Sequence, residues 1–146
     1  MGELSSESDE SSAIAAPSYR GLTWLLRAIG ILDLLAFVAV VMPRSLMVAV
    51  HAQLHIGVLP SEPIVGYLAR TASMFYGFCG VLLLYLATDV VRHRDIIRFL
   101  AVCGIVAGCL VLAIDLGEGM PLWWILFEGP CCGMLAAMVW WMARPR

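Results

Sequence analysis

The chain has 146 residues and a formal net charge of −2; 62% of its residues are hydrophobic and 14% are charged. These proportions exclude an ordinary soluble domain, and we expect no nucleic-acid partner. The apolar residues gather in four runs of about 20 residues each, the length that a helix needs to cross ~30 Å of hydrocarbon. We therefore predict an all-α integral membrane protein, a four-helix bundle surrounded by the lipid bilayer.

Residues 1–19 form an acidic tail that is rich in serine. Its acidic residues are Glu3, Glu7, Asp9 and Glu10. The tail offers too little apolar surface to fold alone, so we predict that it is disordered. A secretory signal would begin with basic residues, so we expect the first apolar run to be kept as a helix. Residues 20–146 are then one four-span membrane domain.

The predicted spans are separated by short polar links. We place the spans at about residues 22–42, 64–87, 96–116 and 121–143. Residues 44–57 are too short and too polar to form a span, and Met47, Val50 and Leu54 fall on one helical face. This pattern predicts a short helix lying on the membrane surface between the first two spans.

Two histidines of this surface segment are the weak candidates for a metal site. His51 and His55 stand four residues apart and could reach one ion, but the nearby sequence offers too few further ligands. The five cysteines fall within the spans without a C-x-x-C spacing, where a thiol packs as a small apolar group. We predict no metal site and no cofactor.

Glycines recur on the predicted faces between helices. Small residues let transmembrane helices approach closely, and residues 104–108 have the G-x-x-x-G spacing. The link at residues 117–121 is a tight turn, so the third and fourth spans should be antiparallel neighbours. The predicted packing glycines are Gly66, Gly77, Gly80, Gly104, Gly108, Gly129 and Gly133.

A charged residue, Arg70, lies well inside the second span. A buried guanidinium is costly unless it is paired, and the acids at a similar depth are Asp33, Asp115 and Glu128. We predict that these four residues form a buried polar cluster in which Arg70 pairs with Glu128 or Asp33. The cluster serves either to bind a ligand or only to fix the helix register. Polar groups that could complete its hydrogen bonds are Tyr67, Thr71, Ser73 and Tyr76.

Basic residues are unequally divided between the two sides of the predicted bundle. Arg44 stands alone in the links on one side. The other side carries Arg20, Arg27, Arg92, Arg94, Arg98, Arg144 and Arg146. By the positive-inside rule we expect both termini to be cytoplasmic, with the protein in the inner cell membrane.

Residues 63–70 (PIVGYLAR) and 120–130 (MPLWWILFEGP) resemble segments of small, uncharacterised bacterial four-span membrane proteins that are loosely DoxX-like. The resemblance covers residues 22–142 and implies the four-span architecture without a catalytic motif. The chain is also similar to small multidrug-resistance exporters, which have an acid in the first span and glycines in the third. Arg70 and Glu128 depart from that second pattern.

The intramembrane charges come without a recognisable nucleophile, metal set or cofactor motif. We therefore expect a non-enzymatic membrane protein, structural or binding an apolar or lipid-like ligand, with an outward-facing pocket around Arg70. The first alternative is a proton-coupled small-molecule transporter that acts as an oligomer, with Asp33 or Glu128 exchanging protons. A membrane-embedded enzyme ranks below it. Whether the partner is a second copy or another membrane protein stays open.

Overall fold

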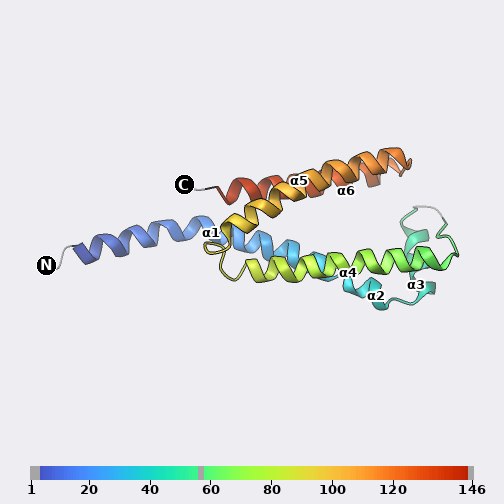
Figure 1. Cartoon of the computed structure of the whole chain (residues 1–146), viewed down its shortest axis with the longest axis horizontal. Coiled ribbons are helices and arrows are strands. Elements are labelled where there is room, and N and C mark those ends of the chain that lie inside the picture. The colour runs from blue at the N-terminus through green and yellow to red at the C-terminus, as the bar shows by residue number, and fades with distance from the viewer. Residues whose placement is uncertain (1–3, 56–57, 145–146) are drawn as a thin grey trace.

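A computed structural model describes residues 4–55 and 58–144, with side chains from residue 19 onward. The chain folds into a bundle of helices (Figure 1). They are α1 (Leu4–Leu34), α2 (Phe37–Val41), α3 (Arg44–Gln53), α4 (Pro63–Leu86), α5 (Arg94–Gly117) and α6 (Leu122–Met142). Four stretches are long and apolar enough to cross a membrane: Tyr19–Val41, Pro63–Leu86, Arg94–Gly117 and Leu122–Met142. The predicted all-α four-span fold is confirmed.

Prolines set the helix ends around α3. Met42 is extended, with ψ 129°, because the following Pro43 disfavours a helical backbone before it. Pro63 opens α4, where its missing N–H would have no helical partner. Helix α3 ends at Gln53 rather than near residue 57, and His55 follows with a positive φ of 54°.

The long helices pack as two antiparallel pairs, α1 with α4 and α5 with α6. Glycines bring the backbones into contact in both pairs. A Cβ added to Gly80 would lie 2.6 Å from the carbonyl oxygen of Gly30, and one added to Gly108 would lie 2.8 Å from that of Gly129. No larger residue fits at either position without moving a helix, so close backbone packing holds each pair together.

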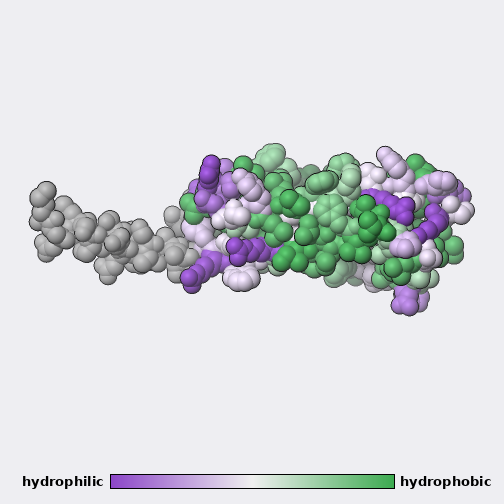
Figure 2. All heavy atoms as spheres, turned by 90° about the horizontal axis from the view of Figure 1, so that it is seen from below, coloured by the Kyte–Doolittle hydropathy of each residue, from purple (hydrophilic) through white to green (hydrophobic). Residues whose placement is uncertain are grey.

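The two pairs meet near the turn between α4 and α5, which we call the terminal end; the opposite end is the α3 end (Figure 1). At the terminal end α1 contacts α6, where Gly21 lies against Met142. An apolar core fills the junction; its buried residues are Leu22, Leu26, Leu86, Ala87, Val90, Ile97, Ala101, Val139 and Ala143. Figure 2 shows hydrophobic residues in a broad band between hydrophilic ends, as expected of a membrane-spanning bundle.

The first span is broken between α1 and α2. Leu35 N–H donates to the carbonyls of both Ile31 (3.2 Å) and Leu32 (3.1 Å), so the helical hydrogen-bond pattern tightens there. Neither Leu35 nor Ala36 is proline or glycine, so the sequence carries no signal for the break. Beyond it, the ring of Phe37 covers Gly77 and packs edge-on against Phe78 at 5.5 Å.

Helix α1 begins at Leu4, so its backbone is helical over much of the tail for which the sequence predicts disorder. Starting a helix is costly, but extending an existing one adds a hydrogen bond for each residue that becomes ordered. The first span supplies such an existing helix. The tail therefore continues α1 in this structure (Figure 1).

Candidate functional site

Arg70 reaches from α4 toward the end of α2. Its Nη2 donates a hydrogen bond of 2.9 Å to the carbonyl oxygen of Met42. Met42 stands at the C-terminal end of α2, where the last carbonyls have no partner within the helix. The Arg70 side chain is exposed on the outside of the protein rather than enclosed by the helices. The hydrogen-bond acceptor of Arg70 is therefore a carbonyl at a helix end, where the sequence predicts a carboxylate.

In this structure Arg70 contacts Met42, and its pairing with Glu128 or Asp33 stays a prediction. Another α4 residue, Tyr76, lies within charge–charge interaction range of both acids. Tyr76 stands about 9 Å further along the axis of α4 than Arg70, at ~1.5 Å per residue. Arg70 is thus displaced toward the α3 end and faces α2 instead of the acids.

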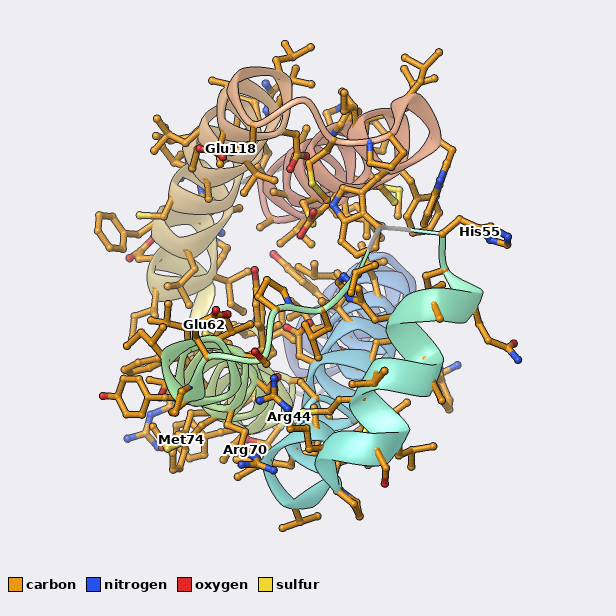
Figure 3. The ribbon with its side chains drawn as sticks, turned by 90° about the vertical axis from the view of Figure 1, so that its right-hand side faces the viewer. Arg44, His55, Glu62, Arg70, Met74 and Glu118 are labelled. Carbon is orange, nitrogen blue, oxygen red and sulfur yellow. The ribbon has the colours of Figure 1, made fainter. Side chains whose placement is uncertain are left out.

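A second guanidinium reaches the same side of α4. Arg44, the first residue of α3, donates from Nη2 to the carbonyl oxygen of Pro60. Its Nη1 lies 3.4 Å from where a Cβ of Gly66 would stand, so the missing side chain leaves room for this arginine. Figure 3 shows Arg44 and Arg70 beside each other, between α4 and the α2–α3 segment.

Both arginines line a cavity of about 380 Å³ that we call the arginine pocket. Among the residues that the structure describes, its lining is Arg44, Met47, Pro63, Gly66, Tyr67, Arg70 and Thr71. This lining combines guanidiniums with the hydroxyl groups of Tyr67 and Thr71, and none of these described residues is acidic. Such a pocket is suited to a ligand with an anionic head and an apolar body.

The acids Asp33 and Glu128 belong to a different place, on facing helix pairs. Glu128 on α6 accepts a hydrogen bond from the indole Nε1 of Trp124, one turn earlier. Tyr76 on α4 lies within charge–charge interaction range of Glu128, Asp33 and Cys132. We call Asp33, Tyr76, Glu128 and Cys132 the carboxyl cluster.

Asp115 joins neither group. It is buried in the last turn of α5, with 6% of its surface exposed. Its Oδ2 has no hydrogen-bond partner among the described residues. Ser73 is half-buried on α4. The four predicted cluster residues are thus divided among three places, although Tyr67 and Thr71 do lie with Arg70.

Sequence reasoning missed several residues of these sites. The sequence identified Arg44 only as the lone basic residue of the links on one side, and nothing in its neighbourhood indicates that α3 returns to α4. Trp124 and Cys132 could have been predicted from the sequence, because each stands four residues from Glu128 and so shares its helical face. The i, i+4 spacing was the signal that could have found them.

The two candidate metal-binding histidines are not on one helix. His51 lies within α3, whereas His55 lies beyond its end and points away from the bundle (Figure 3). Within residues 4–55 and 58–144, no group of three or more His, Cys, Asp or Glu side chains is placed to hold a metal ion.

Comparison with known proteins adds no family to this description. No protein-family model, curated protein or solved structure matches the chain. The DoxX-like resemblance therefore stays a prediction.

Proposed function

We propose that this multi-pass membrane protein is a non-enzymatic binding protein that holds a lipid-like ligand at the arginine pocket. The observation that carries the proposal is the presence of two guanidiniums in one cavity whose described lining residues include no acid. The α4 surface beside Tyr67 is apolar: Ile64 and Leu68, one turn apart on one helical face, are both 57% exposed. A ligand with a polar head and an apolar chain would contact both kinds of surface.

The orientation that we propose puts this pocket in the outer half of the membrane. The terminal end carries most of the arginines, which supports a cytoplasmic location for it under the positive-inside rule. Arg70 follows Pro63, the start of α4, by about 10 Å along the helix axis. Its long side chain would meet the region where lipid head groups give way to acyl chains.

Native mass spectrometry of the detergent-purified full chain tests this proposal. We expect the wild-type protein to carry a bound molecule of lipid mass, and Arg70→Gln to weaken its retention about tenfold or more, since one charge-assisted contact is lost. The matched control is Arg92→Gln, exposed in the turn between α4 and α5. Absence of a bound molecule from the wild type, or an equal loss in the control, would contradict the proposal.

Proton-coupled transport by an oligomer is the second candidate function. The carboxyl cluster favours it, because Asp33, Tyr76 and Glu128 come from three different helices. Intramembrane acids in such positions often carry protons. Proteoliposomes with a pH-sensitive dye should then show proton movement that depends on a cationic substrate and disappears in Glu128→Gln. Asp95→Asn, at the exposed start of α5, is the control. No proton movement across a varied panel of cationic compounds would remove this candidate.

A further inference from the structure

Two like charges border the arginine pocket, and the described residues of its lining include no acid that would neutralise them. Arg44 donates to Pro60 and Arg70 donates to Met42, both of them backbone carbonyls. Each guanidinium has five N–H groups, so donors remain available on both. Two cations beside one cavity repel each other, even where both side chains are exposed. A bound anion would offset this repulsion.

The geometry of two guanidiniums favours a phosphate over a carboxylate. One planar guanidinium fork can occupy both oxygens of a carboxylate, whereas a tetrahedral phosphate offers oxygens to forks that approach from different directions. Arg44 comes from α3 and Arg70 from α4. The pocket also holds the hydroxyl groups of Tyr67 and Thr71, which can donate to remaining phosphate oxygens.

We infer that Arg44 and Arg70 jointly hold the phosphate group of an amphipathic ligand, which ties α3 to α4. This inference rests on the proposed function and names the polar group of its ligand. Phosphate could reach the site as a lipid head group or as the free anion. Met47 and Pro63 in the lining, and the exposed Leu68 on α4, favour a lipid because they offer contacts to an acyl chain.

The test compares ligands that differ only in the phosphate. Binding to the detergent-purified full chain is measured for dioleoyl phosphatidic acid, for dioleoylglycerol and for inorganic phosphate. We expect phosphatidic acid to bind about tenfold or more tightly than dioleoylglycerol, because charge-assisted hydrogen bonds are lost with the phosphate. Inorganic phosphate should compete only weakly. If it binds as tightly as phosphatidic acid, the phosphate site is supported and its lipid source is overturned.

Charge variants test the two arginines separately. Arg44→Gln and Arg70→Gln should each reduce the preference for phosphatidic acid about tenfold, while Arg92→Gln leaves it unchanged. Arg44→Lys and Arg70→Lys keep the charge but lose the fork, so an intermediate loss is expected, which guards against variants that do not fold. Added salt should weaken the binding of phosphatidic acid but not that of dioleoylglycerol.

The outcomes separate this inference from the function on which it rests. Equal binding of phosphatidic acid and dioleoylglycerol, unaffected by either arginine variant, would overturn the phosphate site and leave a lipid-binding protein. Binding of neither lipid would overturn the proposed function itself. A loss of phosphatidic acid binding in Arg70→Gln but not in Arg44→Gln would overturn the joint role of the two arginines.

Discussion

The two ends of the bundle differ in how their side chains pack. At the terminal end the helix pairs join through an apolar core in which Leu22, Leu26, Leu86 and Ile97 are almost completely buried. At the α3 end, Arg44 and Arg70 lie together in the lining of the arginine pocket. Both ends carry polar residues (Figure 2), but the buried apolar core lies at the terminal end and the arginine pocket at the α3 end.

The bilayer explains this division. Burying an apolar side chain against another helix gains little hydrophobic free energy in a membrane, because lipid is equally apolar, so close packing must supply the stability. Glycine contacts and the terminal core provide such packing. We expect the arginine pocket, by contrast, to contribute less to the stability of the bundle. Substitutions at the two kinds of place should therefore differ in their effect on stability.

The largest effect should come from a glycine at the contact between α5 and α6. Gly108→Ala would put a Cβ 2.8 Å from backbone atoms of Gly129 and Gly133, which cannot move without shifting α6. We expect a loss of about 2 to 3 kcal/mol in the free energy of unfolding. Denaturation in mixed micelles measures it.

Gly133 provides the matched control for that contact. A Cβ added to Gly133 would meet no atom within 4 Å, although its own backbone touches Gly108. Gly133→Ala should therefore stabilise α6 by up to ~1 kcal/mol through helix propensity. Equal destabilisation by both substitutions would show that the backbone contact is not the reason for glycine at position 108.

The next largest effect should come from the terminal core. Leu86→Ala removes most of a side chain that is 1% exposed and leaves a cavity where the pairs join. We expect a loss of about 2 kcal/mol, at the low end for such substitutions because lipid also solvates the unfolded helices. Leu82→Ala, one turn earlier and 42% exposed, is the control and should change the free energy of unfolding little. Equal losses would contradict the assignment of stability to this end.

The sequence was sufficient for the features that repeat along the chain. Apolar runs of spanning length predicted the four helices, and prolines at 43 and 63 marked where helices end or begin. The break at Leu35 and Ala36 was not predictable, because neither residue is a proline or a glycine. Just beyond the break, Phe37 packs over Gly77 of another helix, a contact that no local sequence signal indicates.

The candidate site was predicted less well for a related reason. Depth along a span can be estimated from the helical rise, and it put Arg70 near the acids. Depth does not determine which face of a helix a neighbouring helix contacts. The arginine side chain is also long enough to reach several different hydrogen-bond acceptors. The carbonyl of Met42 becomes such an acceptor only because α2 ends there. The fold-back of α3, which brings Arg44 to α4, has no marker in the sequence.

The smallest expected effect is the coupling between Arg70 and Glu128. Arg70 donates to Met42, and Glu128 accepts from Trp124, so the two side chains share no partner. Free energies of unfolding measured for Arg70→Leu, Glu128→Leu and the double variant should therefore add to within about 0.5 kcal/mol. A pair of Trp124→Phe and Glu128→Leu is the positive control and should show coupling of about 1 kcal/mol, since the two residues share a hydrogen bond. The double variant of Arg70 and Glu128 could instead recover 1 kcal/mol or more of the stability lost by Arg70→Leu alone. That result would show an ion pair between α4 and α6 in the membrane. Arg70 would then belong to the carboxyl cluster and not to the arginine pocket.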